Sequence, residues 1–179
     1  FYEGDVFYNG ISLKRHYNVL KNIIGYVPQE DIVFENLTLK KMLYYTAKMK
    51  MPDNTSMQEI EDRIQEVLRL IELTEHQNTM IKNLSGGQKK RASIAVELLA
   101  DPGMFFLDEP TSGLDPGTEQ KLMRVLNRLS KTQGKTIVMV THTTQSLDLC
   151  DKIIFMGKKG RLAFMGTPEE AKMFFGTES

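Results

Sequence analysis

The residues best suited to bind a phosphate stand together as Leu84-Ser85-Gly86-Gly87-Gln88. Ser85 and Gln88 have the spacing of a capping box, in which a serine hydroxyl accepts a backbone amide at the start of a helix. Two glycines let a ligand approach the backbone closely, and the first-turn amides of a helix carry partial positive charge. The pattern predicts an anion site that suits phosphate, although a capped helix start with a flexible turn would have the same residues.

A second group of candidate residues follows an apolar run that is typical of a buried strand. The run Met104 to Leu107 ends at the adjacent carboxylates Asp108 and Glu109. Ligands of open α/β sheets bind beyond the carboxyl ends of the strands. One carboxylate could face Mg²⁺ there while the other orients or deprotonates an attacking water, or the pair could simply begin an acidic loop.

Two further polar residues fit the same sheet edge. His142 follows the strand run 136–141, so the same reasoning places it beyond a strand end. Gln29 follows Val27-Pro28 and could present an amide oxygen to a metal or a water. His16 and His76 have no such setting, and we expect them to be ordinary surface or core residues.

The elements that must position these residues alternate in type after Pro102. The expected strands are 104–107, 136–141, 153–156 and 161–164. The expected helices are one from residue 116, one over 144–150 and one over 167–175. Such alternation predicts a parallel sheet covered by helices. Asp115 is expected to cap the helix whose first residue is Pro116.

The first hundred residues have a different pattern. Gly4 to Leu13 alternates in strand fashion around Asn9-Gly10, a pair that favours a hairpin turn. A short strand is expected over 23–27, and residues 30–99 then carry mostly helical signals. We therefore expect an inserted helical subdomain between two parts of a sheet.

Within this insert, Ser56 and Glu59 have capping-box spacing and precede one apolar helix face. The members of that face are Ile60, Ile64, Val67, Leu68 and Ile71. Three segments are expected: an N-terminal β segment (1–29), a helical subdomain (30–100), and a second part of the core with the C-terminal elements (101–179).

Composition narrows the class of protein. The chain has 179 residues, with 23 basic and 23 acidic side chains. Its formal net charge of +0 therefore provides no overall electrostatic attraction for the phosphates of a nucleic acid. No apolar run approaches the roughly 20 residues of a membrane-spanning helix. The single cysteine, Cys150, cannot form an intrachain disulfide, which favours a reducing, intracellular compartment.

Together the motifs resemble those of the ATP-binding-cassette ATPases over nearly the whole chain. In the family's order they are a Q-loop (Tyr26 to Gln29), the signature LSGGQ (Leu84 to Gln88), a Walker B strand (Met104 to Glu109), a D-loop (Ser112 to Asp115) and the switch histidine (His142). Within the family, the chain looks most like the White-type (G) subfamily and bacterial relatives whose membrane partners belong to the ABC-2 export class.

The resemblance implies roles at the sheet edge. Asp108 would hold Mg²⁺ through water, Glu109 would polarise the attacking water, and His142 would contact the γ-phosphate. Gln29 would bind at the metal and nucleotide, and would link this site to the helical subdomain and a transmembrane permease.

The resemblance also implies a site shared between two subunits. Ser85, Gly86, Gly87, Gln88 and Asp115 would contact ATP bound to the opposite nucleotide-binding domain. The active unit would be a head-to-tail dimer that encloses two ATP. It would lie at the cytoplasmic face of the membrane.

The fold implied is α/β: a P-loop NTPase-like parallel sheet with an inserted α-helical subdomain and a small N-terminal hairpin. The P-loop pattern G-x-x-x-x-G-K-[ST] does not occur in these residues, because Gly134-Lys135-Thr136 has Leu129 where the first glycine is required. In the family that loop precedes a segment like Gly4-Asp5-Val6. We therefore expect a fragment of an ABC transporter ATPase whose sheet lacks the P-loop strand and which is inactive alone.

Two other interpretations remain open at this point. A soluble ABC-type ATPase acting on ribosomes or DNA would share the motifs, although the neutral charge counts against it. A non-catalytic dimerisation fragment, which lends Ser85 to Gln88 to another subunit, is the second.

Overall fold

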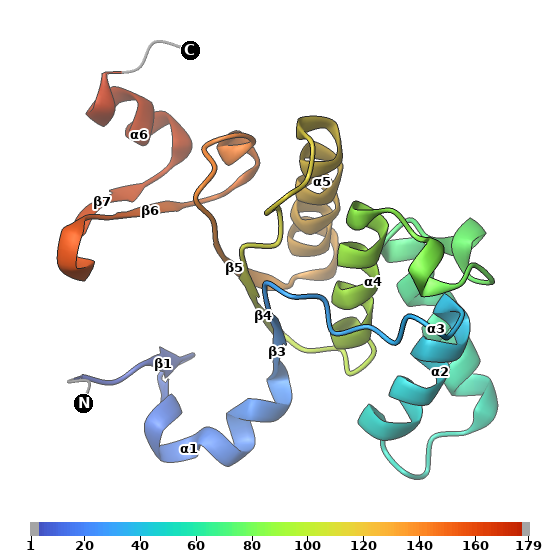
Figure 1. The fold of residues 1–179 in the computed structure, drawn as a ribbon. Helices are drawn as coiled ribbons and strands as arrows, with labels where there is room; N and C mark the ends of the chain where they lie inside the picture. Colours follow the sequence, from blue (N-terminus) through green and yellow to red (C-terminus); the bar gives the residue numbers. More distant parts are fainter. Residues whose placement is uncertain (1–3, 177–179) are drawn as a thin grey trace.

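The computed structural model describes residues 4–176 (Figure 1). Residues 1–3 and 177–179, the ends of the expected first and third segments, lie outside the described residues. The centre of the molecule is a parallel sheet in the order β3-β4-β5. Its strands are β3 (Ile24–Val27), β4 (Met104–Asp108) and β5 (Thr136–Val140). These elements agree within one residue with the strands expected from the apolar runs.

The register of this sheet aligns the strand ends. Val27 lies opposite Leu107, and Asp108 lies opposite Val140. Because all three strands are parallel, the residues that follow them emerge at one edge, which is where α/β sheets bind ligands.

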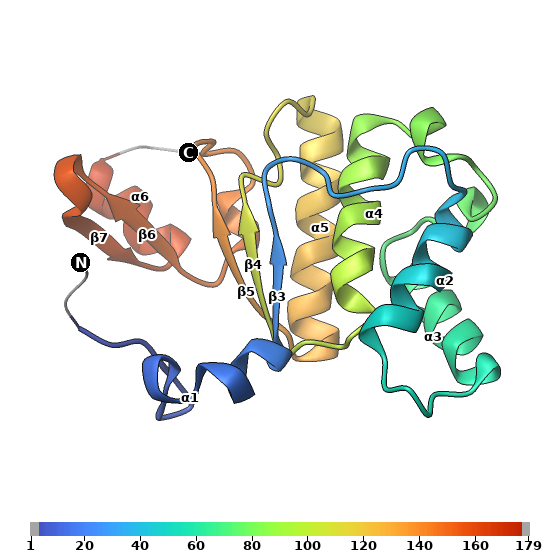
Figure 2. The ribbon, with the colours of Figure 1, turned by 60° about the horizontal axis from the view of Figure 1, so that its bottom comes forward.

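Helices cover one side of the sheet and extend away from it. They are α2 (Leu39–Lys50), α3 (Met57–Leu70), α4 (Gly86–Leu98) and α5 (Pro116–Gln133), with 3₁₀ turns η2 (Thr74–His76) and η3 (Ile81–Asn83) before α4. Figure 2 shows α5 beside the sheet, then α4, then α2 and α3. The capping box of Ser56 and Glu59 forms at the start of α3, and the apolar face predicted behind it is buried.

Helix α5 begins where its sequence predicts. The Asp115 carboxylate accepts hydrogen bonds from the amides of Gly117 and Thr118, and Pro116 occupies the first turn. Gly134 ends the helix in the left-handed conformation, with φ of 61°, which glycine adopts without steric cost.

The N-terminal hairpin forms as expected. Strands β1 (Phe7–Tyr8) and β2 (Ile11–Ser12) pair antiparallel around Asn9 and Gly10, whose φ angles are 48° and 79°. Two helical elements that the sequence analysis did not anticipate, α1 (Leu13–Leu20) and the 3₁₀ turn η1 (Lys21–Ile23), then lead into β3.

Two expectations for the C-terminal part were wrong. Strand β6 (Ile153–Met156) does not join the parallel sheet but pairs antiparallel with β7 (Leu162–Gly166), because left-handed Lys159 and Gly160 reverse the chain between them. The helix expected over 144–150 is only the 3₁₀ turn η4 (Leu147–Leu149), since Ser146 has a left-handed φ of 61°.

The chain continues after β7 into α6 (Pro168–Phe175), close to the helix expected over 167–175, and Thr167 caps its start. Figure 1 shows the unit of β6, β7 and α6 standing apart from α2 and α3, on the far side of the parallel sheet. Among residues 4–176, no helix is both long enough and apolar enough to cross a bilayer.

Candidate functional site

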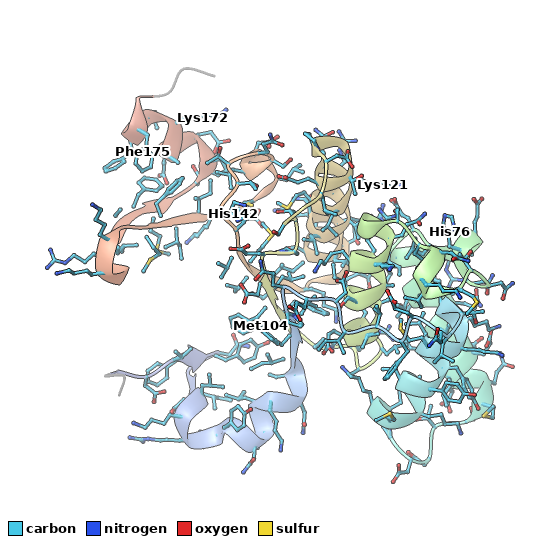
Figure 3. The ribbon with its side chains drawn as sticks, in the orientation of Figure 1. His76, Met104, Lys121, His142, Lys172 and Phe175 are labelled. Atoms are coloured by element: carbon cyan, nitrogen blue, oxygen red, sulfur yellow. The ribbon has the colours of Figure 1, made fainter. Side chains whose placement is uncertain are left out.

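Three polar side chains meet at the carboxyl edge of the parallel sheet. Nε2 of Gln29 donates a hydrogen bond of 3.0 Å to Oε2 of Glu109. Nδ1 of His142 lies 3.4 Å from the same oxygen. Figure 3 labels His142 at the opposite end of the sheet from Met104, the first residue of β4. Residues that are far apart in the sequence therefore form one cluster, as the strand-end argument predicts.

The backbone turn after β4 holds Glu109 in place. Its φ of 44° is in the left-handed region, which is sparsely populated by residues other than glycine. The Glu109 amide donates to the carbonyl oxygen of Val140 at 2.9 Å, and its own carbonyl accepts the Ser112 amide at 3.0 Å. Such a backbone persists only where the surroundings fix it, and here they fix a carboxylate at the sheet edge.

A buried carboxylate anchors the segment that carries His142. The Thr143 hydroxyl donates to Oε1 of Glu119 at 3.1 Å, and Glu119 is buried on α5. The Thr143 amide donates to the Thr141 hydroxyl at 3.2 Å. The imidazole itself is exposed, so it is available to a ligand approaching from solvent. The sequence analysis did not anticipate Glu119, because its partner lies on another element.

Asp108, the last residue of β4, is half-buried directly before Glu109. Among the described residues, no three His, Cys, Asp or Glu side chains gather into a metal-binding group.

The Ser85 turn has the capping box predicted from the sequence. The Ser85 hydroxyl accepts the Gln88 amide at 3.4 Å, and the Gln88 side chain accepts the Ser85 amide at 2.8 Å. Ser85 and Gly86 are exposed, so the first turn of α4 is open to a ligand. Nε2 of Gln88 also lies 2.9 Å from Nε2 of His76. His76 therefore supports the Gln88 side chain, a contact that the residues around His76 in the sequence do not predict.

Gly87 brings α4 against the start of α5. A Cβ atom at Gly87 would lie 2.1 Å from Cγ2 of Thr118, so this contact requires glycine. Thr118 also hydrogen-bonds to Asp115, and this bond together with backbone amides lowers the pKa of the Asp115 carboxyl. The signature turn and the Asp115 loop are therefore packed together.

The two groups of candidate residues face the same end of the molecule. In Figure 2, the first turns of α4 and α5 lie at the end toward which the strands of the parallel sheet point. The sheet edge can orient a water and contact an anion, while the exposed first turn of α4 can accept an anion from outside. Gln29 and His142 each contact Glu109, whereas Ser85 and Gly86 belong to a separate exposed surface.

Comparison with known proteins identifies relatives for most of the chain. A family model described as "ABC transporter" matches residues 1–112. The chain is 38% identical over 175 residues to the ABC transporter ATP-binding/permease protein Rv1747 of Mycobacterium tuberculosis, which covers 98% of this chain and 20% of that protein. It is 39% identical over 159 residues to Protein white of Drosophila melanogaster, covering 84% of this chain and 23% of that protein.

A further relative is the broad substrate specificity ATP-binding cassette transporter ABCG2 of Bos taurus, with 36% identity over 180 residues, covering 97% of this chain and 27% of that protein. The chain thus spans about a fifth to a quarter of the length of these curated relatives.

Solved structures share the fold. cbiO1 from Clostridium perfringens, described as part of the ABC transporter complex cbiONQ, aligns with a TM-score of 0.86 and 28% identity over 96% of this chain and 68% of that one. The ATP-binding cassette MJ0796, in a dimeric post-hydrolysis state bound to ADP and Pi, aligns with a TM-score of 0.74 and 29% identity over 92% of this chain and 73% of that one. The fold is the α/β, P-loop NTPase-like fold of ABC ATPase domains, and the chain belongs to the ABC transporter family.

Proposed function

We propose that the chain is part of the nucleotide-binding domain of an ABC exporter, which hydrolyses ATP between two copies and drives a membrane permease. The observation that carries this proposal is the convergence of Gln29 and His142 on one oxygen of Glu109. Similarity to the ATP-binding/permease protein Rv1747 supports a permease partner, and the export direction rests on the resemblance of the motifs to White-type and ABC-2 relatives. The location that follows is the cytoplasmic face of a membrane.

Glu109 is the residue proposed to polarise the attacking water. Gln29 and His142 both contact Oε2, so they fix the orientation of the carboxylate. In the described part of the chain, the second oxygen, Oε1, accepts no hydrogen bond from protein and is available to a water. A carboxylate held within hydrogen-bond reach of a water is the arrangement that general-base catalysis needs. His142, which is exposed, would then contact the γ-phosphate.

The oxygen donors at this edge fit Mg²⁺. Mg²⁺ binds through one or two carboxylates together with phosphates and waters rather than in an all-protein cage. Asp108 supplies a carboxylate, and the amide oxygen of Gln29 remains available because Nε2 donates to Glu109. When bound with ATP, Mg²⁺ would neutralise charge on the phosphates.

The Ser85 turn is proposed to act on the nucleotide of a second copy. Its exposed serine and glycine, together with the positive end of α4, suit a γ-phosphate that approaches from outside. Gln88 and Asp115 shape this surface from within and complete the proposed contact. A head-to-tail pair of nucleotide-binding domains would bring two such turns over two sheet edges.

The proposal is tested with Glu109→Gln in the natural protein, assayed for ATP hydrolysis and for ATP binding. Loss of the charged base while the amide keeps the shape predicts a fall in turnover of about 10²-fold or more with binding preserved. Glu97→Gln is the matched control, because Glu97 forms only a surface ion pair with Lys50 on the helical side. Undiminished turnover in Glu109→Gln would overturn the role given to Glu109.

A further inference from the structure

Lys90 is a buried lysine on the signature helix α4. Its residue exposure is 5%, although an ammonium group is ordinarily solvated. Nζ lies 2.7 Å from the carbonyl oxygen of Gln29 and 2.9 Å from Oδ1 of Asp31. Both contacts lie in the segment that follows β3, so one side chain connects the signature helix to the strand end that carries Gln29.

The neighbouring lysine provides a comparison. Lys89 on the same helix pairs with Glu35 of the same segment at 2.8 Å, but this pair lies at the surface, where solvent screens it. Lys90 is withdrawn from water, so the hydrogen bond to Gln29 and the charge of Asp31 must replace the hydration that the ammonium loses. A buried charge of this kind is costly unless its partners are held in place.

The contact continues directly into the proposed active site. The carbonyl oxygen of Gln29 accepts from Lys90, while the side-chain amide of the same residue donates to Oε2 of Glu109. No helix or strand covers residues 28–37, so regular backbone hydrogen bonding does not fix this segment. The Lys90 ammonium therefore ties the Gln29 carbonyl directly to α4 by a side-chain hydrogen bond.

We propose that Lys90 is a positioning residue for ATP hydrolysis: its ammonium fixes the Gln29 backbone so that the Gln29 amide reaches Glu109. The inference rests on the proposed function of this edge. Lys90 touches neither nucleotide nor water in this role, and it acts only through Gln29. Its ion pair with Asp31 holds the ammonium over the segment and is the secondary contact.

Lys90→Met separates this role from a general contribution to folding. Methionine matches the length of the buried stem and carries no charge, but removing one partner of a buried ion pair is strongly destabilising, because the other charge is left uncompensated. It removes the donor to Gln29 and the charge beside the buried Oδ1 of Asp31, so urea denaturation of the variant must first show that it remains folded under the assay conditions. Lys89→Met, one residue away on the same helix, is the matched control.

The test measures the kcat and KM of ATP hydrolysis for the natural protein and both variants, with hydrogen exchange of residues 28–35 in each. A displaced Gln29 amide predicts a kcat about tenfold lower in Lys90→Met, with KM changed less than about twofold and faster exchange in this segment. Lys89→Met should keep kcat within about twofold. Asp31→Asn should fall between the two, because the Gln29 contact remains.

The outcomes distinguish the two levels of the proposal. If the unaltered protein hydrolyses no ATP, the proposed function itself fails, and the role of Lys90 fails with it. If the unaltered protein is active and Lys90→Met matches Lys89→Met in kcat and exchange, the positioning role alone is overturned. A fall in kcat without faster exchange of residues 28–35 also overturns it, because the effect would not pass through that segment.

Discussion

The helical region of α2, α3 and α4 buries its apolar side chains, whereas the strands on the far side of the sheet leave many of theirs exposed to solvent. The core of α2, α3 and α4 is closed to solvent, as shown by Leu68, which has 0% exposure. On the far side, Val140 of β5 is 60% exposed and Leu162 of β7 is 62% exposed. Both regions are rich in apolar residues, but the first buries them far more completely within the described chain.

The difference in burial follows from how much of its own apolar surface a group of helices or a sheet can bury. Amphipathic helices that pack side by side bury their own apolar faces. A parallel sheet needs cover on both faces and a partner at each edge strand, and β5 is an edge strand here. The candidate site lies at the end of this sheet, so we expect its geometry to depend on further cover of β5. That the 179 residues alone are inactive stays a prediction.

The largest expected effect tests the helical side of this comparison. Leu68→Ala removes a fully buried side chain and should lower the free energy of unfolding by about 2–5 kcal/mol. Val140→Ala, the control on the exposed edge of β5, should cost less than about 1 kcal/mol, because little burial is lost. Urea denaturation of both variants measures the difference. An equal loss of unfolding free energy in the two variants would contradict the difference in burial between the two regions.

A smaller effect on stability is expected where α4 packs against α5, the helix that lies beside the sheet. Gly87→Ala would place a Cβ 2.1 Å from Cγ2 of Thr118, so α4 and α5 must move or Thr118 must change rotamer, at about 1–3 kcal/mol. Gly86→Ala is the control, because its nearest neighbour, Cδ2 of Leu114, would lie at 3.7 Å. Thermal unfolding of the two variants measures the difference in stability. A Gly87→Ala protein as stable as Gly86→Ala would show that the α4–α5 contact can shift at no cost.

The smallest effect concerns Asp115, which caps the first turn of α5. Hydrogen bonds from Thr118 and from backbone amides lower the pKa of Asp115 below its ordinary value of 3.8. The ionised cap therefore stabilises the fold above the unfolded-state pKa, and this contribution is lost as pH falls through the lower folded-state pKa. Asp115→Asn should flatten this part of the stability profile between neutral and acidic pH. An unchanged profile would argue against the cap as its source.

Sequence reasoning located what depends on local pattern. The capping boxes at Ser56 and Ser85 and the strand ends at Asp108 and His142 follow from spacing and from strand direction alone. The structure then placed Gln29, Glu109 and His142 in one cluster, which agrees with the strand-end argument, while their catalytic roles stay predictions.

What sequence reasoning missed depends on partners that are distant in the chain. The side chain of His76 contacts Gln88, and that of Glu119 accepts from Thr143; both partners lie on other elements, so the local sequence carries no signal of either contact. Strand β6 was assigned to the parallel sheet because alternation predicts strand type but not strand partner. The burial of Lys90 was likewise invisible, since a lysine in a basic run ordinarily faces solvent.

Mixing two inactive variants of the natural protein most directly tests whether one triphosphate is held by two copies. Glu109→Gln removes the proposed base, and Gly86→Asp places a carboxylate in the exposed first turn of α4, where it would repel phosphate. If each site combines the sheet edge of one copy with the Ser85 turn of the other, the mixed dimer keeps one intact site. Random pairing should then restore about a quarter of the wild-type ATP hydrolysis. Mixtures as inactive as either variant alone would contradict a site shared between copies.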